Sequence, residues 1–318
     1  MLNENSELKI LIFVPCDNDL FKERHGKLVR QWLVYVSEYY NKKINFNFTE
    51  INIIHQKIPP LNDVLKYNGL LITGGFASIG HKDPWLGELR HLIRLLFVHK
   101  FPMFGICFGF QVISQALGSS YLLAPYGFNF FALDYKLEPK ASAFFKPFFN
   151  YYHRYEYNNK LNGNKTNNGV IDLNKENYNS IIGLFSHNDV ITSLPDGSNI
   201  DYGSYEDQNR TEIDEALSDL VVTNISSSDK FPILGYLAGD SKRTFILSLQ
   251  HHPEFHTSPG LTYFNDVLSL KLSQGLMSSD QFEKNIEMIK MFNESNSGKV
   301  YGLMTLSLFS NGYIKPEQ

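Results

Sequence analysis

Cys107 is the residue of this sequence best placed for covalent chemistry, because it stands where an apolar strand is expected to turn into a helix. It lies in FPMFGICFGFQVISQALG (residues 101–118), between Gly105 and Gly109. A thiol becomes a strong nucleophile only as the thiolate, which a nearby base and the positive end of a helix both favour. Flanking glycines permit a cramped turn and let a substrate carbonyl approach the backbone. The corner by itself also fits a buried cysteine that fills space.

A base, and a group to orient it, occur far downstream in QHHPEF (residues 250–255). If the imidazole of His252 points toward the thiol, Glu254, held by the fixed backbone of Pro253, could orient the ring and stabilise its protonated form. His251 is a competing candidate for the base. Taken alone, the same segment is typical of a polar loop after a strand.

Paired glycines in ITGGFAS (residues 72–78) supply a third element. The oxyanion of a tetrahedral intermediate is stabilised by backbone N–H donors. We assign one donor to Phe108, directly after the nucleophile, and the second to Gly75.

The segments around these motifs predict an α/β fold. Strands are expected in four apolar or alternating segments, at residues 8–16, 44–54, 67–75 and 101–107. Helical spacing lies between and after them, at residues 22–42, 85–100 and from Gln111 onward. Strands that alternate with helices form right-handed crossovers, so we predict a three-layer α/β sandwich with a mainly parallel central sheet. Ligands bind outside the carboxyl ends of such strands, where Gly75 and Cys107 are both expected.

Composition narrows the class of protein. The chain has 318 residues, 43% of them hydrophobic, and a net charge of −4, which gives no reason to expect nucleic acid or anionic lipid as a partner. Two cysteines are too few for a disulfide framework, and Cys16 lies in an apolar strand, where it is expected to be core. The first apolar run is too short for a signal or membrane segment. These features predict a cytoplasmic protein with small-molecule ligands.

Three motifs in this order resemble those of the class I (triad-type) glutamine amidotransferases. GICFGFQ resembles the G-x-C-x-G-[aromatic, His or Met]-Q signature, QHHPE is similar to the H-P-E element, and ITGGFAS is similar to the oxyanion glycines. FSHNDVITSLP (residues 185–195) resembles the Ser-His-x-Asp-x-V segment that helps line the glutamine pocket. The resemblance spans roughly residues 8–262. It is strongest to a free-standing branch similar to GMP synthetase glutaminase domains and plant γ-glutamyl peptidases.

The resemblance implies a reaction and a set of residues. A thiolate would attack a γ-glutamyl amide, the base would protonate the leaving nitrogen, and water would hydrolyse the thioester to glutamate. The implied catalytic residues are Cys107, His252 and Glu254, the oxyanion donors are Gly75 and Phe108, and the glutamyl-binding residues are Gln111 and His187. No cofactor and no metal is implied. Phe76 stands where the family commonly has proline, and Asn129 stands about where relatives often carry glutamate.

Three functions stay open at this point. The chain could be a hydrolase that acts alone on γ-glutamyl dipeptides or glutathione-type conjugates. It could be a glutaminase subunit that passes ammonia to a separate synthetase, since the sequence has no G-x-x-x-x-G-K-[ST] loop of its own. It could also be a catalytically silent binding or scaffolding module, although an intact triad argues against that. Intracellular cysteine peptidases of similar fold place histidine after the nucleophile, where this chain has Phe108.

The expected domain organisation is a single α/β domain over residues 1–262 and a helical extension of it over residues 263–318. Two polar stretches, near residues 151–180 and 196–219, lack an apolar period and are expected to be surface insertions without chemistry.

Overall fold

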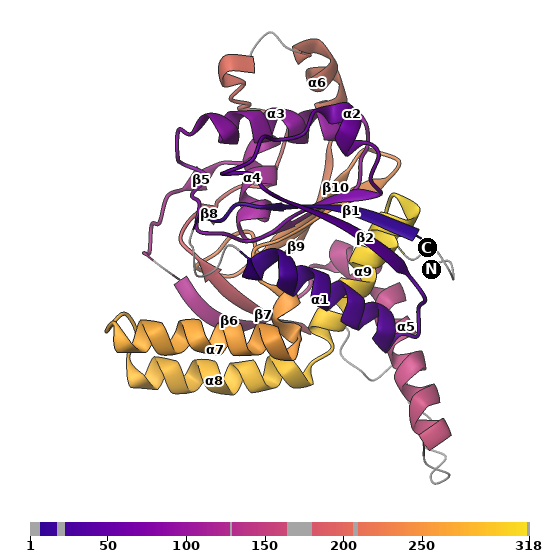
Figure 1. Cartoon of the computed structure of the whole chain (residues 1–318), viewed down its shortest axis with the longest axis vertical. Coiled ribbons are helices and arrows are strands. Elements are labelled where there is room, and N and C mark those ends of the chain that lie inside the picture. The colour runs from indigo at the N-terminus through magenta and orange to yellow at the C-terminus, as the bar shows by residue number, and fades with distance from the viewer. Residues whose placement is uncertain (1–6, 18–22, 128, 164–179, 206–208, 317–318) are drawn as a thin grey trace.

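The protein is built around a seven-stranded sheet (Figure 1), seen in a computed structural model that describes residues 7–17, 23–127, 129–163, 180–205 and 209–316. The strands are β1 (Glu7–Val14), β2 (Asn45–Asn52), β3 (Gly69–Ile72), β4 (Met103–Ile106), β9 (Val221–Ser226), β10 (Gly235–Gly239) and β11 (Thr244–Leu249). Their order is β2-β1-β3-β4-β11-β10-β9. The first five of these run parallel, and β10 is antiparallel to both its neighbours.

Helices cover both faces of this sheet. One face carries α1 (Arg24–Tyr39), α5 (Pro139–Gly163) and α9 (Ser297–Asn311). The other carries α2 (Leu61–Val64), α3 (Pro84–Val98), α4 (Phe108–Ala116) and α6 (Arg210–Leu217). Strand β1 shows why both faces are covered, because its side chains are apolar on both. Ile10 and Ile12 belong to a first hydrophobic core on one face, whereas Leu11 and Phe13 belong to a second core on the other. The predicted three-layer sandwich is therefore confirmed.

Two small antiparallel sheets and a pair of helices complete the chain. The small sheets are formed by β5 (Tyr121–Leu122) with β8 (Val190–Ile191), and by β6 (Asn129–Lys136) with β7 (Ser180–His187). The paired helices α7 (Ser258–Ser273) and α8 (Ser279–Glu294) lie side by side against β6 and β7 and share a third core with Leu184. Short 3-10 turns are η1 (Gly203–Tyr205) and η2 (Pro253–His256).

The C-terminal part of the chain is helical, and its first helix, α7, begins at Ser258. The boundary expected after residue 262 falls inside α7. Helix α9 contributes Tyr301 and Met304 to the core that it shares with α1. The last helices thus pack directly on the layers around the sheet.

The first part of the stretch near residues 151–180, which was expected to be a polar surface insertion, continues α5 as far as Gly163. Aromatic rings explain this, since tyrosines of α5 pack against tyrosines of α1. The rings in contact are those of Tyr151, Tyr152 and Tyr155 with those of Tyr39 and Tyr40. Ring burial against a second helix supplies the apolar surface that the sequence pattern did not reveal. The remainder of the expected insertion, residues 164–179, lies outside the described residues.

The acidic stretch near residues 196–219 is also structured over most of its length. It contains η1 and α6, and Ile213 and Leu217 of α6 are buried in the second core. A short amphipathic helix therefore lies within the stretch expected to be a surface insertion. Residues 206–208 lie outside the described part of the chain.

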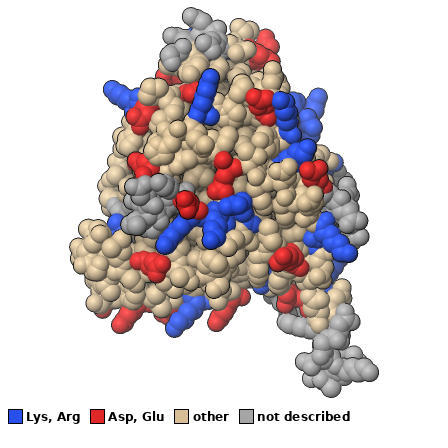
Figure 2. Space-filling model, in the orientation of Figure 1, with Lys and Arg blue, Asp and Glu red and all other residues tan. Residues whose placement is uncertain are grey.

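Charge is distributed without a dominant sign on the face drawn in Figure 2, where basic and acidic side chains are interspersed. Within the described ranges, no helix is both long and apolar enough to cross a bilayer.

Candidate active site

The three sequence motifs meet at one edge of the sheet. Strands β3, β4 and β11 are adjacent and parallel, and they end at Ile72, Ile106 and Leu249. Their carboxyl ends therefore bring Cys107 and His252 to the same place, as expected for ligand sites in such sheets.

Cys107 occupies a sharp elbow between β4 and α4. Its φ is 53° and its ψ is −102°, a conformation that non-glycine residues rarely adopt. Its N–H donates to the carbonyl oxygen of Leu249 at 2.8 Å, and its thiol donates to the carbonyl oxygen of Ser186 at 3.2 Å. Because α4 starts at Phe108, the N–H of Phe108 has no acceptor within the helix.

Two glycines allow the close approaches that this elbow requires. A Cβ on Gly109 would lie 2.1 Å from the carbonyl oxygen of Ile72, so only glycine lets α4 pack this closely on the end of β3. A Cβ on Gly74 would lie 2.7 Å from Cε1 of His252. The glycine pair thus leaves room for the imidazole beside the loop.

His252 and Glu254 form a buried pair. Nδ1 of His252 lies 2.7 Å from Oε1 of Glu254, and both side chains are almost fully buried. The ring of Phe255 stacks on the imidazole with centroids 4.5 Å apart, which fixes the ring plane. Nε2 of His252 has no hydrogen-bond partner among the described residues.

The charge environment keeps His252 protonated. Burial alone would lower the pKa of the imidazole, but the charges of Glu254 and Cys107 and the hydrogen bond to Glu254 raise it to about 10. An imidazolium beside a sulfur is the form that can deliver a proton to a leaving nitrogen.

His251, the competing candidate for the base, lies elsewhere. Its Nδ1 is 3.2 Å from the hydroxyl of Tyr135, its ring packs on Tyr301, and burial followed by the charge of His252 lowers its pKa to about 3. It does not line the pocket that contains Cys107. Its role in the described structure is to fill the core.

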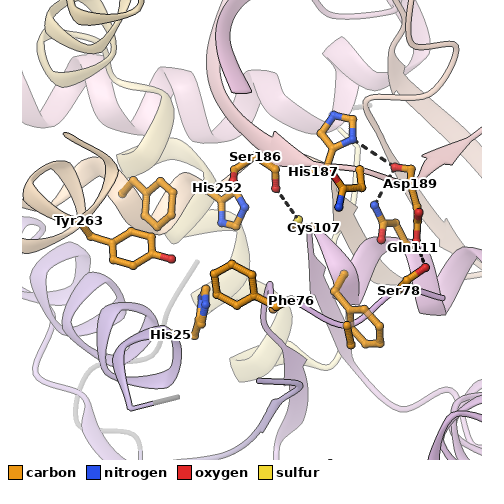
Figure 3. Close-up of a pocket in the computed structure, with 15 residues that line it drawn as sticks. His25, Phe76, Ser78, Cys107, Gln111, Ser186, His187, Asp189, His252 and Tyr263 are labelled. Carbon is orange, nitrogen blue, oxygen red and sulfur yellow. Dashed lines mark hydrogen bonds between the residues drawn. The ribbon is translucent and has the colours of Figure 1, made fainter. Parts of the chain in front are cut away.

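A pocket of about 80 Å³ opens beside Cys107 (Figure 3). On the side away from His252 it is lined by Gln111, His187 and Asp189. Gln111 donates from Nε2 to the backbone carbonyl of Asp189 at 2.9 Å and to Oε1 of Gln250 at 3.2 Å. Gln111 therefore lines the pocket while its N–H groups hold the loop after β7.

His187 presents a neutral ring to this side of the pocket. Burial lowers its pKa to about 4, with the charges of His252 and Lys230 adding to the effect against the hydrogen bond to Asp189. The Nδ1 of His187 donates to the carbonyl oxygen of Asp189 at 3.1 Å, so Nε2 carries the lone pair. No described residue bonds to Nε2, which leaves an acceptor for a ligand.

The carboxylate of Asp189 ties the loops around the pocket together, a role that sequence reasoning missed. It accepts hydrogen bonds from the hydroxyl of Ser78 at 2.5 Å, the N–H of Ile79 at 3.2 Å and the N–H of Ala124 at 3.3 Å. The aspartate in the HNDV phrase was the available signal. It links the loop after the glycine pair to the segment that holds His187.

Asn129, where relatives often carry glutamate, is buried but does not line the pocket. Its Oδ1 accepts from Nζ of Lys230 at 2.9 Å, and Nζ also lies over the rings of Tyr126 and Phe231. The residue pairs across β6 and β7 with His187. An amide that accepts from lysine thus occupies this position.

Two pocket residues could not be foreseen from motifs. His25 comes from α1 and Tyr263 from α7, helices that carry no recognisable signature. Only the packing of these helices brings them to Cys107. Among the described residues, no group of three or more histidine, cysteine, aspartate or glutamate side chains could hold a metal ion.

Comparison with known proteins identifies the family of this chain. The family model for glutamine amidotransferase class-I matches residues 31–270, most of the chain. The chain belongs to the class-I glutamine amidotransferase family. A Saccharomyces cerevisiae protein named for the glutamine amidotransferases is 37% identical over 222 residues, which cover 67% of this chain and 65% of that protein. Gamma-glutamyl peptidase 2 of Arabidopsis thaliana is 28% identical over 102 residues, 32% of this chain and 39% of the peptidase. The matched regions thus span less than two thirds of either relative.

Solved structures agree on the fold of this glutamine amidotransferase-family chain. A glutamine amidotransferase from Thermotoga maritima superposes with a TM-score of 0.57 at 14% identity, covering 95% of this chain and 98% of that one. A second, from Methylobacillus flagellatus, gives 0.56 at 13% identity, covering 97% and 96%. At such identities the likeness concerns the fold.

Proposed function

We propose that this chain is a cysteine hydrolase that cleaves a γ-glutamyl amide through a γ-glutamyl thioester. The observation that carries the proposal is the arrangement of Cys107 on a strained elbow at the helix start, beside a His252 that is oriented and charged by Glu254. Nucleophile, base and orienter are the parts that covalent acyl transfer requires. Family membership supports hydrolase chemistry of this kind.

In the first half of the reaction, Cys107 reacts as the thiolate, with its proton held by His252, and attacks the γ-carbonyl carbon. The N–H groups of Gly75 and Phe108 stabilise the oxyanion. His252 then returns the proton to the amide nitrogen as the C–N bond breaks, and ammonia or an amine leaves. The γ-glutamyl group remains bound to sulfur.

In the second half, His252 removes a proton from water, and the hydroxide attacks the thioester carbonyl. The C–S bond breaks, the sulfur leaves as the thiolate beside the protonated His252, and the product loses its acid proton to solvent and leaves as glutamate. Nε2 of His187 accepts a hydrogen bond from the glutamyl amino group, which its free lone pair supports. Gln111 shapes the same wall of the pocket.

Glutamate release tests the proposal directly. The purified chain is incubated with glutamine and a panel of γ-glutamyl amides, and glutamate is quantified alongside the mass of Cys107-containing peptides in quenched samples. Glutamate together with a γ-glutamyl adduct on Cys107 supports the mechanism. Absence of glutamate from every substrate contradicts the hydrolase, and an adduct on another residue contradicts the assignment of the nucleophile.

Delivery of ammonia to a separate synthetase is the second candidate. One observation favours it: the small chain of carbamoyl phosphate synthase of Corynebacterium diphtheriae is 34% identical over 76 residues, 23% of this chain and 19% of that protein. In that case glutamine hydrolysis by the isolated chain would be slow and would rise when a synthetase is added. A high rate without any partner favours the free-standing hydrolase.

A further inference from the structure

His25 is a buried histidine with no visible role in the fold. It is 5% exposed, and neither ring nitrogen has a hydrogen-bond partner among the described residues. Burial, followed by the charge of His252, lowers its pKa to about 3, so the ring is neutral and carries one donor and one acceptor. Buried polar groups are normally paired because an unpaired one lowers stability. Two unpaired nitrogens on one ring therefore indicate a missing partner.

The ring of His25 lines the pocket of Cys107 together with Phe76 and Tyr263. Its centroid is 6.1 Å from that of Phe76 and 5.8 Å from that of Tyr263, both in edge-on geometry. Tyr263 is buried, whereas Phe76 is 49% exposed and marks the mouth. Burial raises the pKa of Tyr263 above its ordinary value, so its hydroxyl keeps its proton.

The pocket has two sides around the sulfur of Cys107. Figure 3 shows His25, Phe76 and Tyr263 on the side of His252, with Gln111, His187 and Asp189 on the other. In amide cleavage the leaving nitrogen must face the residue that protonates it. The amine is therefore expected on the side of His252, and the glutamyl group on the side of His187.

We propose that His25, Phe76 and Tyr263 form a subsite for the leaving amine and that His25 sets its specificity. This inference rests on the proposed γ-glutamyl hydrolase. The subsite takes amines that carry a flat apolar group and, close to the nitrogen, a carbonyl or carboxamide oxygen. The N–H of His25 donates to that oxygen, and the rings of Phe76 and Tyr263 contact the flat group. Ammonia from glutamine would leave both functions unused.

Four substrates separate the two recognition elements. γ-Glutamyl-phenylalaninamide offers a ring and a carbonyl, γ-glutamyl-phenethylamide only the ring, γ-glutamyl-glycinamide only the carbonyl, and glutamine neither. For the unaltered protein we expect kcat/KM for the phenylalaninamide to exceed that for glutamine at least tenfold. A site that hydrogen-bonds a substrate group discriminates against the analogue that lacks it.

His25→Phe keeps a ring and removes both nitrogens. We expect it to lower the kcat/KM ratio of phenylalaninamide to phenethylamide about tenfold, the size of one lost hydrogen bond. His91→Phe is the matched control, since His91 is also a buried histidine but lies on α3 outside the pocket, and it should keep the ratio of the unaltered protein. Phe76→Ala changes a half-exposed residue, so it should fold, and it should lower the ratio of phenylalaninamide to glycinamide.

Each outcome bears on the inference. The subsite would be overturned if the kcat/KM ratios stayed unchanged in His25→Phe and Phe76→Ala. It would also be overturned if the unaltered protein preferred glutamine. In both cases glutamate release would still support the hydrolase. An equal loss on all four substrates would also overturn it, because His25 would then serve the site without selecting the amine. If no substrate yields glutamate, the proposed function falls and the subsite with it.

Discussion

At the scale of single residues, the surroundings of Cys107 and Cys16 distinguish the proposed nucleophile from a thiol of the core. Cys107 has a positive φ and lines a pocket with an imidazole, whereas Cys16 is fully buried among apolar side chains. Backbone strain that persists at one position is often found at functional sites. Burial alone does not distinguish the two, since Cys107 is itself only 4% exposed.

We predict opposite effects for serine at these two positions. Cys107→Ser should lower glutamate release on the order of 10³-fold or more, because a hydroxyl is a far weaker nucleophile at neutral pH, and should change stability little. Cys16→Ser should keep activity per folded molecule and lower the free energy of unfolding by about 1 to 3 kcal/mol, the cost of a buried hydroxyl. Kinetics and urea unfolding on both variants measure this. Faster iodoacetamide labelling of Cys16 than of Cys107 would contradict the assignment.

We predict that Glu254 sets the pH above which kcat/KM falls. The pKa of His252 is raised to about 10, so kcat/KM for a γ-glutamyl substrate should fall as pH rises through that value. Glu254→Gln removes the charge that holds the proton, so the fall should begin at lower pH, with kcat/KM at neutral pH reduced by about 10²- to 10⁴-fold.

Glu254→Asp retains a carboxylate and is the control, for which the alkaline limb should stay closer to that of the unaltered protein. The same pair affects stability. Because the folded pKa of His252 exceeds its ordinary 6.5, the protonated ring contributes stability that is fully present below pH 6.5 and lost as pH rises through about 10. An alkaline limb unchanged in Glu254→Gln would refute the coupling.

At the scale of elements, the carboxyl ends of β3 and β4 were predictable from sequence. Continuous apolar runs that lead into glycine or cysteine indicate both strands and the region where each one ends. The length of α5 was not predictable, because its stability comes from rings such as Tyr151 that meet α1 only after folding. The sequence motifs did not indicate His25 and Tyr263 for the same reason. Both residues lie on helices, and only the packing of those helices brings them to the pocket.

The junction of α4 and β3 gives an element-scale prediction. Gly109→Ala should lower the free energy of unfolding by roughly 2 to 3 kcal/mol despite the higher helix propensity of alanine, because the new Cβ meets the carbonyl of Ile72 at 2.1 Å. Displacement of α4 should also reduce glutamate release by moving Cys107.

Gly87→Ala is the matched helical control. Its nearest atom to a new Cβ is 3.9 Å away, on Tyr205, so alanine should stabilise the protein by about 0.5 to 1 kcal/mol. Urea unfolding of both variants gives the comparison. Equal stabilities would show that α4 can move away from β3 without loss.

At the scale of the whole molecule, buried histidines make the fold sensitive to acid. Among the described residues, five of them have a lowered pKa: about 3 for His25 and His251, about 4 for His187 and His256, and below the ordinary value for His91. In each, burial is the largest cause. Below pH 6.5 the unfolded chain therefore binds protons that the folded chain does not, which favours unfolding.

We predict that stability falls as pH drops from 6.5 to about 4, by up to roughly 1.4 kcal/mol per pH unit for each such histidine. His256 lies away from the pocket. His256→Gln should make this decline in stability less steep by the contribution of one histidine. Urea unfolding at several pH values measures the slope. Identical slopes for the two proteins would contradict the buried neutral state of His256.

The walls of the pocket have separate origins, and this has an evolutionary consequence. Cys107 and His252 lie just after the carboxyl ends of β4 and β11. His25 and Tyr263 lie on the helices α1 and α7. If the proposed subsite binds the leaving amine, substitutions on the two helices would change which amine is accepted and leave the proposed catalytic residues unchanged. Related proteins would then differ in the amides they cleave through substitutions on α1 and α7 alone.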